Sequence, residues 1–307
     1  MRNRYGLPYM GSKNAIAPWV LSYIPKAENF YDLFCGGCAI THCAIETGKY
    51  NNLFINDING ALPHGFLDCI NGKYRNDFRW ISHEDFDAMK GKGDLLVDIC
   101  FSFGNNYMKG YAYSREIEPF KKAVHYYVCF GDGSLFLDLF GICLPDSTNT
   151  QDAEFRMSYV KKLIGRMGDL PQHLSSLDRL QSLERLFAID AIRSKTVQRS
   201  VSNIHASTMS YDLVPIKPNS VIYCDIPYRS TAQYNDAEFD YEKFYDWCSK
   251  QTAPTFISEY DMPLDKFVCI GAKRKQVLLC SKDNSKSKIE KLFIPIHQAE
   301  NKPLTLF

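Results

Sequence analysis

The sequence predicts an α/β domain that is built from both ends of the chain and interrupted by a mostly helical insertion. Two observations lead to this prediction. Strand-like apolar runs flank a helical segment near the N-terminus, and strand-like runs return after residue 203. Between them, Asp and Gly clusters, aromatic-rich pieces and long helical patterns replace this alternation. We therefore expect one domain from residues 1–62 and 203–307, with residues 63–202 as the insertion.

The first elements form an α/β unit. Residues 29–34 (NFYDLF) predict a strand, residues 35–38 a tight turn with two glycines, residues 39–47 a helix, and residues 52–56 (NLFIN) a second strand.

The later elements begin with a long helix over about residues 177–199, where Leu and Ile recur at helical spacing. Four strand-like runs follow it, at residues 220–224, 255–258, 267–270 and 276–280.

Composition limits the class of protein. The 307 residues, 45% of them hydrophobic, are enough for one large domain or for a core domain with an insertion. No apolar run is long enough for a membrane span, and the basic N-terminus has no apolar stretch behind it, so we expect neither a membrane protein nor a signal peptide. Eleven scattered cysteines, an odd number, favour buried thiols in a reducing cytoplasm.

Net charge is uninformative, but charge is segregated along the sequence. The total is +1, whereas residues 266–291 carry eight basic and two acidic residues and residues 236–265 carry eight acidic and two basic. The predicted helix also carries Arg179, Arg185, Arg193, Lys195 and Arg199. Two interpretations are open for the basic stretches: contacts with DNA phosphates, or a solvated helix face or edge hairpin.

The turn after the first predicted strand has features of a nucleotide-type pocket. Gly36 and Gly37 remove side chains where the chain turns, so a ligand can approach the backbone beside a helix N-terminus. Asp57 follows Gly37 by 20 residues, the spacing at which an acid holds ribose hydroxyls. The chain lacks the G-x-G-x-x-G pattern of pyrophosphate binding, which favours S-adenosylmethionine, a ribose ligand without phosphate. The alternative is an ordinary structural turn.

A second motif, Asp225-Ile226-Pro227-Tyr228, directly follows an apolar strand, where open α/β sheets bind ligands. The carboxylate of Asp225 and the backbone carbonyl of Ile226 can accept both N–H bonds of an amino group on a base. This favours a pyramidal nitrogen and stabilises the positive charge that develops on it. Pro227 fixes the loop, and Tyr228 offers a ring on which an extruded base can stack. The alternative is a plain strand-to-turn junction.

Four short motifs, together with the strand and loop that follow the last of them, resemble the DNA adenine methylase family in their order. YMGSK (residues 9–13) is similar to its aromatic-x-Gly-x-Lys segment and DLFCGGCAI (32–40) to its Phe-x-Gly-x-Gly motif. NDIN (56–59) resembles its ribose-binding acid, CDIPY (224–228) its Asp-Pro-Pro-Tyr catalytic motif, and FISEYDMP (256–263) the strand and loop that follow.

The resemblance implies an S-adenosylmethionine-dependent methyltransferase with a Rossmann-like sheet, helices on both faces and a target-recognition insertion. Its activity would be site-specific methylation of adenine N6 in flipped-out bases of double-stranded DNA, and a cognate restriction enzyme is a candidate partner. It implies cofactor contacts by Tyr9, Lys13, Asp32, Phe34, Gly36, Gly37, Asp57 and Asp225, and catalytic roles for Asp225, Ile226, Pro227 and Tyr228.

Two departures from the family pattern stand in these motifs. Cys38 replaces the second glycine, and Ile226 replaces the first proline of the catalytic motif. We expect Ile226 to supply the required carbonyl in a less rigid loop.

Alternative functions remain open. Methylation of cytosine N4, RNA or a protein amide would use the same cofactor fold, and a catalytically inactive DNA-binding relative could keep the same scaffold. Asp225 favours adenine. Residues 102–106 (SFGNN) and 109–114 (KGYAYS) are candidates for base reading or for plain turns. Cys35, Cys38, His42 and Cys43 have a zinc-like spacing, but they would have to ligate from one turn and one helix face, so we predict no metal.

Overall fold

The chain folds into two compact units in the computed structural model, which describes residues 4–9, 11–145, 152–166, 180–192, 203–228, 239–276 and 287–299. The sheet unit comprises Gly11–Lys73 and Ile192–Phe307 together with Asn3–Leu7. The helical unit comprises Tyr74–Ala191 together with Pro8 and Tyr9.

The units divide at residues 74 and 191, inside the expected bounds of 63 and 202. The N-terminal difference has a local cause, because helix α3 (Ala61–Asn71) packs against strand β3 (Ile204–Ser207) and so goes with the sheet.

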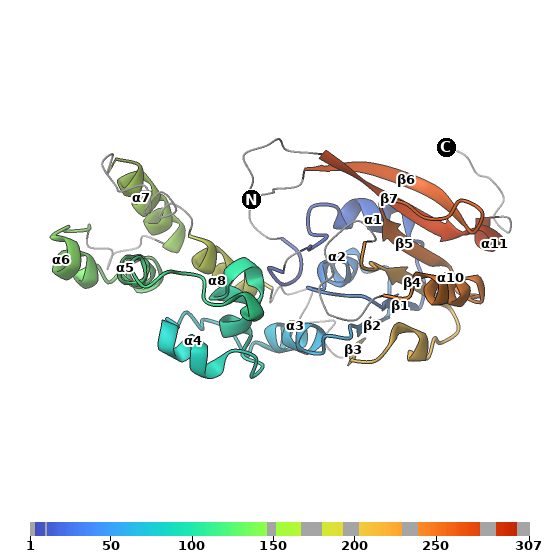
Figure 1. The fold of residues 1–307 in the computed structure, drawn as a ribbon, viewed down its shortest axis with the longest axis horizontal. Helices are drawn as coiled ribbons and strands as arrows, with labels where there is room; N and C mark the ends of the chain where they lie inside the picture. The colour runs from blue at the N-terminus through green and yellow to red at the C-terminus, as the bar shows by residue number, and fades with distance from the viewer. Residues whose placement is uncertain are drawn as a thin grey trace. The chain divides into compact units, whose positions relative to one another are not determined.

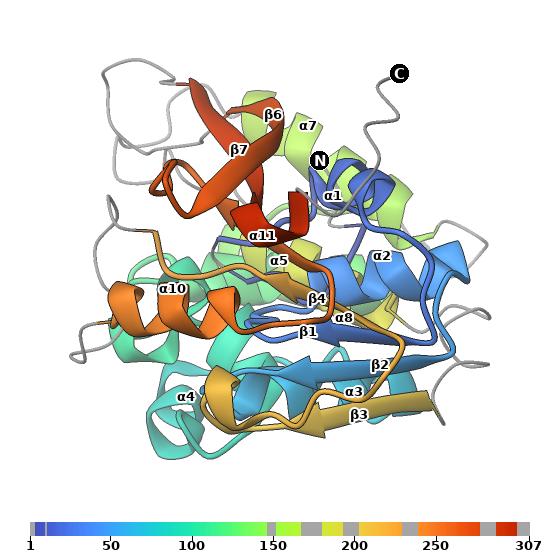
Figure 2. The same cartoon turned by 90° about the vertical axis from the view of Figure 1, so that its right-hand side faces the viewer.

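A seven-stranded sheet organises the sheet unit, and Figure 2 shows β3, β2, β1 and β4 side by side. Its order is β3-β2-β1-β4-β5-β7-β6; the first five strands are parallel, and β7 is antiparallel to both β5 and β6. The remaining strands are β1 (Asn29–Asp32), β2 (Asn52–Asn56), β4 (Ser220–Cys224), β5 (Thr255–Glu259), β6 (Phe267–Gln276) and β7 (Ser287–Pro295).

The order of the parallel strands reverses between β1 and β4. These strands pair directly, with Asp32 opposite Tyr223, so the segments that follow them start side by side at the same edge of the sheet. In doubly wound sheets, this reversal point at the carboxyl ends is where ligands bind.

Helices cover both faces of the sheet. Thr41 of α2 (Ala39–Thr47) hydrogen-bonds Asp32 on one face. On the other face, α10 (Tyr241–Ser249) buries Phe244, Tyr245 and Cys248 in a core with Tyr31, Ile222, Cys224 and Ile257. Because neighbouring residues of a strand point to opposite faces, Tyr31 belongs to the apolar core and Asp32 does not. This confirms the predicted α/β class with helices on both faces.

Most predicted elements are confirmed, several of them to the residue. Strand β1 is two residues shorter than predicted, and β6 extends to Gln276, where the sequence predicted two separate strands. Of the predicted helix over 177–199, Gln181–Asp190 is observed as α8, while residues 177–179 and 193–199 lie outside the described part of the chain, as do 277–280. Strands β3 and β7 were not predicted from the sequence.

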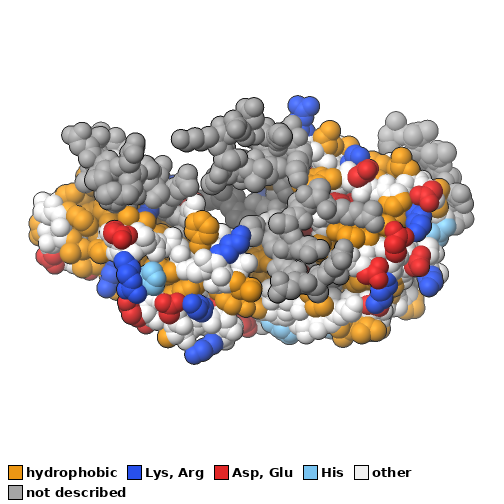
Figure 3. Space-filling view, viewed as in Figure 1, with side chains coloured by type: hydrophobic (Ala, Val, Ile, Leu, Met, Phe, Trp, Pro, Cys, Tyr) orange, Lys and Arg blue, Asp and Glu red, His pale blue; other side chains and the backbone are white. Residues whose placement is uncertain are grey.

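The helical unit is built from helices (Figure 1). Its described part also contains one isolated β-bridge, between Ser102 and Tyr111. Helix α5 packs against α6 and α7, and α6 exposes Leu137, Leu139 and Phe140. Figure 3 shows hydrophobic side chains gathered over the region of α6. The helices are α4 (His83–Met89), the π-helix η1 (Leu96–Cys100), α5 (Glu118–Phe130), α6 (Ser134–Phe140), α7 (Ala153–Arg166) and α8.

Two further properties concern the described residues only. None of their helices has both the length and the apolar character that crossing a membrane requires. No disulfide joins the cysteines in this part of the chain.

Candidate active site

Four side chains of the sheet unit meet in one cluster at the end of β4. The ammonium of Lys13, only 3% exposed, lies 2.7 Å from Oδ1 of Asp225 and 3.6 Å from Oε1 of Glu290. It also donates a hydrogen bond to the hydroxyl of Tyr228. That hydroxyl in turn donates to Oε1 of Glu290 at 2.5 Å. A residue near the N-terminus is thereby joined to the motif at residues 225–228 and to β7.

The neighbouring charges keep both hydrogen-bond donors of this cluster, Lys13 and Tyr228, protonated. Burial by itself would lower the pKa of Lys13, but Asp225 and Glu290 raise it above its ordinary value, so Lys13 is a cation. Burial, together with the same two carboxylates, raises the pKa of Tyr228 far above its ordinary value, so its hydroxyl stays protonated.

The loop at residues 225–228 is held in place at each residue. Ile226 is buried in the core beneath α10, Tyr241 donates a hydrogen bond to the carbonyl of Pro227 at 2.9 Å, and the ring of Tyr228 stacks on Tyr260 with 4.3 Å between centroids. The expected loss of rigidity from replacing proline at 226 is thus offset by burial of the isoleucine side chain.

Asp32 ends β1 beside this cluster and is almost completely buried. Its Oδ2 accepts a hydrogen bond from Thr41 at 2.7 Å, while its Oδ1 has no partner among the described residues. Burial raises its pKa to about 7; Thr41 opposes this shift, and the charges of Asp225 and Asp57 add to it. An unpartnered buried oxygen of this kind can accept a hydrogen bond from a ligand.

The turn after β1 is tied to the end of β2. The amide of Gly36, a residue with φ of +46°, donates to Oδ2 of Asp57 at 2.8 Å, and the amide of Asn59 donates to its Oδ1 at 2.9 Å. Burial raises the pKa of Asp57, and these two amides counteract it. A carboxylate has further lone pairs, so Asp57 can still accept hydroxyl groups.

Cys38 lies at the start of α2 with φ of +57°, in the left-handed region that glycine would occupy without strain. A residue with a side chain in this conformation costs about 1–2 kcal/mol.

The N-terminal segment crosses this turn at very close range. Leu7 donates its amide to the carbonyl of Gly37 at 2.6 Å, and a Cβ added to Gly6 would lie 2.3 Å from the same oxygen. The amide of Gly6 also donates to Nδ1 of the buried His42 at 2.9 Å. His42 therefore holds the N-terminal segment, and burial lowers its pKa to about 4.

Two predicted cofactor residues have other surroundings. Phe34 packs against Tyr211 and Phe244 on the α10 side of the sheet, with ring centroids 5.3 Å and 5.9 Å away. Tyr9 groups with the helical unit, where it is half-buried. The described ring contacts of Phe34 are thus with this aromatic core.

Arg185, one of the predicted DNA-binding residues, makes hydrogen bonds inside the helical unit. Arg185 is buried, and its guanidinium donates to the carbonyls of Ile99, Cys100 and Ser102 at 3.2, 3.0 and 2.8 Å. The predicted phosphate contact of Arg185 is therefore wrong, because its guanidinium already donates hydrogen bonds to these three carbonyls at the end of η1. The other basic residues predicted on this helix lie outside the described residues.

The basic stretch at residues 266–291 and the acidic stretch at residues 236–265 contact each other in the folded chain. Lys266 pairs with Glu242 at 3.0 Å and Lys291 with Asp261 at 3.5 Å, so the basic and acidic stretches neutralise each other in part.

The predicted base-reading loop uses part of its polar groups internally. Asn105 donates its side-chain amide to the carbonyl of Pro8, and Oδ1 of Asn106 accepts the amide of Met108 at 3.0 Å. A base-reading role for residues 102–106 and 109–114 stays a prediction.

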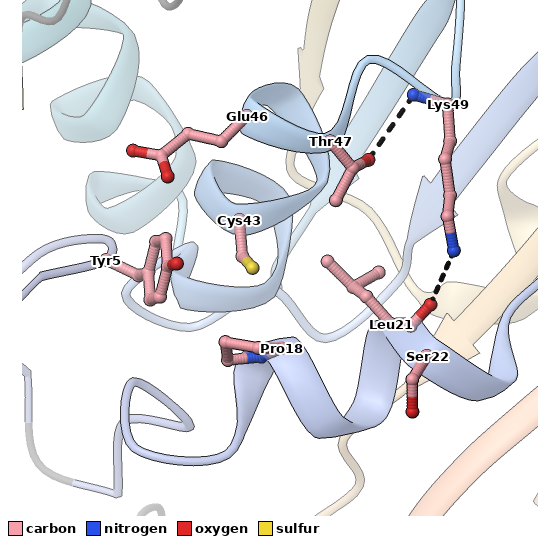
Figure 4. A pocket seen from close by; sticks show the side chains of 8 residues that line it. All are labelled: Tyr5, Pro18, Leu21, Ser22, Cys43, Glu46, Thr47 and Lys49. Atoms are coloured by element: carbon pink, nitrogen blue, oxygen red, sulfur yellow. Dashed lines mark hydrogen bonds between the residues drawn. The ribbon is translucent and has the colours of Figure 1, made fainter.

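A cavity of about 300 Å³ lies elsewhere in the sheet unit, between α1 (Ala17–Tyr23) and α2 (Figure 4). None of its lining residues was predicted to act in the reaction: they are Tyr5, Pro18, Leu21, Ser22, Cys43, Glu46, Thr47 and Lys49. In the described part of the chain, no group of three or more His, Cys, Asp or Glu side chains could hold a metal ion.

Glu290, Thr41 and Tyr260 are members of the candidate site that were not predicted from the sequence. Glu290 had one local signal, a lone acid in an apolar and basic strand (KIEKLFIP). It contacts Tyr228 at a sequence separation of 62 residues, which no local pattern encodes.

Part of the chain matches a known protein family. Residues 9–120 match the family model of D12 class N6 adenine-specific DNA methyltransferase. The predicted resemblance is confirmed. A D12 class adenine-specific DNA methyltransferase is an enzyme, so the match also confirms the predicted function, methylation of adenine N6 in DNA. No curated protein sequence matches the chain significantly.

The D12 match contains Lys13, Asp32, Gly36 and Asp57 but ends before Asp225. The roles of individual residues, including those of the Asp225–Tyr228 motif, are therefore proposals.

Proposed function

We propose that this D12-class chain transfers a methyl group from S-adenosylmethionine to N6 of an adenine flipped out of double-stranded DNA, with Asp225 as the central catalytic residue. One observation supports this assignment above all. Lys13, Asp32 and Asp225, which come from three distant parts of the sequence, converge at the carboxyl ends of β1 and β4, where the strand order reverses.

The residues at this edge fit S-adenosylmethionine, which supplies a methyl group on a positively charged sulfonium. Asp57 would hold the ribose hydroxyls, the backbone at Gly36 and Gly37 would border the ligand, and the unpartnered Oδ1 of Asp32 would accept one of its N–H donors. The acidic character of the edge also suits a cationic ligand. We therefore assign the unit a methyltransferase fold of the S-adenosylmethionine-dependent type.

The chemistry proposed for the motif follows from its hydrogen-bonding groups. Asp225 and the carbonyl of Ile226 would accept the two N–H bonds of the adenine amino group and so orient the nitrogen lone pair. Both oxygens would stabilise the positive charge that develops there, and Asp225 would take up the proton that the methylated nitrogen releases. With 22% of its side chain exposed, Asp225 is accessible for this role.

Tyr228 and Pro227 would position the base. One face of the Tyr228 ring lies against Tyr260, so an extruded adenine would stack on the opposite face and extend an aromatic pile. The hydrogen bond from Tyr241 to Pro227 would keep this part of the loop in place.

The helical unit is the proposed target-recognition part, because it lies between the two sequence segments that form the sheet unit. A recognition element inserted in this way can vary without disturbing the cofactor site.

The decisive experiment is to express the chain in a host without DNA methylation and to map modified bases by direct long-read sequencing. N6-methyladenine at one recurrent sequence supports the proposal. N4-methylcytosine, or methylation of RNA or protein alone in a companion assay with labelled donor, would replace it. Asp225→Ala should lose methyl transfer and keep donor binding in calorimetry; near wild-type turnover in this variant would refute the catalytic assignment. Failure of the wild-type chain to bind the donor would indicate an inactive DNA-binding relative.

A further inference from the structure

Two cysteines flank the glycine pair of the turn between β1 and α2. Cys35 and Cys38 are separated by Gly36 and Gly37, which gives a C-x2-C pattern at the start of a helix. In α/β proteins, such a pattern at the start of a helix is typical of thiol–disulfide chemistry, because the two thiols are held close together. The proposed function gives this pair of thiols no task.

The turn holds the two cysteines at a distance that a disulfide can bridge. The amide of Cys38 donates to the carbonyl of Cys35 at 2.6 Å, which closes a tight turn. Such a turn keeps its first and last Cα atoms within about 7 Å, and disulfides join Cα atoms about 4.4–6.8 Å apart. The side chains converge as well. Both thiols donate to the carbonyl oxygen of Gly36, each at 3.8 Å, and they lie within hydrogen-bonding range of each other.

The backbone at Cys38 indicates that its side chain has a use. Its φ of +57° lies in the left-handed region, which glycine adopts without strain and other residues rarely adopt. The side chain of Cys38 is completely buried, whereas Cys35 is 7% exposed. A thiol that is kept in a strained conformation directly beside a second thiol is the arrangement expected of a reactive pair.

Building on the proposed function, we propose that Cys35 and Cys38 are a modification site, where a peroxide forms a reversible disulfide that weakens donor binding. The thiolate of Cys35, the more exposed of the two, would attack one oxygen of hydrogen peroxide, break the O–O bond and release hydroxide, which leaves a sulfenic acid. The thiolate of Cys38 would then attack the sulfur of Cys35 and displace a second hydroxide. The two thiol protons neutralise the two hydroxides, so two thiols and one peroxide give one disulfide and two waters. Dithiothreitol, oxidised to its cyclic disulfide, would restore both thiols.

The disulfide would act on the donor through the turn that it closes. In the reduced chain, the carbonyl of Gly36 accepts both thiols, and the amide of Gly36 donates at 2.8 Å to Asp57, the proposed ribose acid. Formation of the disulfide removes both thiol protons, so this carbonyl loses two donors and the turn changes its conformation. We expect donor affinity to fall by about three- to tenfold, which corresponds to the loss of one hydrogen bond.

The first experiment detects the disulfide and does not depend on the proposed function. The reduced chain is treated with hydrogen peroxide at about pH 8.5, because burial raises the pKa of both thiols and alkaline solution increases the thiolate fraction. The chain is then denatured, free thiols are blocked with iodoacetamide, and thiols released by reduction are labelled with N-ethylmaleimide. We expect N-ethylmaleimide on Cys35 and Cys38, and iodoacetamide on Cys43, which lies in the same tryptic peptide at residues 27–49.

The second experiment measures the affinity for S-adenosylmethionine by calorimetry before and after peroxide treatment. Wild type should lose about three- to tenfold in affinity and recover it with dithiothreitol. Cys38→Gly, a substitution that the left-handed backbone accepts without strain, should bind the donor equally before and after treatment. Cys269→Ser removes an exposed cysteine of β6 and should respond to peroxide as wild type does.

Iodoacetamide on both Cys35 and Cys38 after peroxide treatment, or a disulfide to Cys43, would overturn the inference. So would equal donor affinity of the reduced and disulfide forms, or a loss in Cys38→Gly as large as that in wild type. If the reduced wild-type chain does not bind the donor at all, the proposed function is contradicted instead, and the labelling still decides whether the disulfide forms.

Discussion

Replacement of Lys13 by methionine tests the energetics of the catalytic cluster most directly. Methionine fills a similar volume but leaves Asp225 and the completely buried Glu290 without their shared cation. Removing one partner of a buried ion pair costs about 3–5 kcal/mol, because the remaining charge is stranded. We expect the free energy of unfolding of the sheet unit to fall by about this amount in Lys13→Met.

The origin of this loss is tested by a double variant. Lys13→Met combined with Glu290→Gln removes the stranded charge and should recover part of the stability, about 1–3 kcal/mol relative to Lys13→Met alone. Urea unfolding followed by tryptophan fluorescence measures both values. Trp19 and Trp247 belong to the sheet unit and Trp80 to the helical unit, so a Trp80→Phe background restricts the signal to the sheet unit.

The pH dependence gives an independent check. The pKa of Lys13 is raised above 10.5 in the folded chain, so its stabilisation is complete below the unfolded value and is lost only as pH rises through the folded one. The deficit of Lys13→Met should therefore be constant from about pH 7 to 9. A deficit below about 1 kcal/mol, or strictly additive effects in the double variant, would refute the view that Lys13 neutralises both carboxylates.

Three further predictions concern stability. Burial raises the pKa of Asp32 to about 7, so between about pH 4 and 7 the folded chain holds a proton that the unfolded chain has lost, and the free energy of unfolding falls as pH rises through this range. The free energy of unfolding of Asp32→Asn, measured with urea, should match that of wild type near pH 4 and exceed it at pH 8 by up to about 4 kcal/mol. Gly6→Ala should cost more than about 2 kcal/mol, because its φ is +68° and the new Cβ meets Gly37, whereas Gly48→Ala, with φ of +63° and open space, should cost only about 1 kcal/mol. Arg185→Met should destabilise the helical unit by about 3 kcal/mol without changing the salt dependence of DNA binding; a smaller salt slope would restore Arg185 as a phosphate contact.

Local patterns in the sequence were sufficient to predict the central elements of the sheet unit with their correct bounds. Strands β2 and β4 and helix α2 begin and end at the predicted residues, because apolar periodicity and flanking turn residues act over short stretches of chain. The two missed strands lacked that signal. Strand β3 has four residues with one buried side chain, and β7 mixes Lys, Glu and apolar residues.

Charge and amide patterns were poor guides to DNA contacts. Arg185 looked like one of several basic residues on a helix, yet it binds three carbonyls of a distant segment. Lys266 and Lys291 looked like part of a basic surface, yet they pair with acids from the preceding stretch. Whether a cation is available to a phosphate depends on which groups folding brings to it, and spacing along the chain does not report this.

The amino-acid sequence by itself was enough to predict the class of reaction, because a glycine turn, an acid 20 residues later and the CDIPY motif are short segments that can be recognised locally. Only the tertiary structure decided how the motifs cooperate. It brought Lys13 between Asp225 and Glu290, and it placed the Asp32 carboxyl in a buried position. The physical reason is that charge balance and burial depend on distance in space, and strand order, rather than sequence separation, sets those distances.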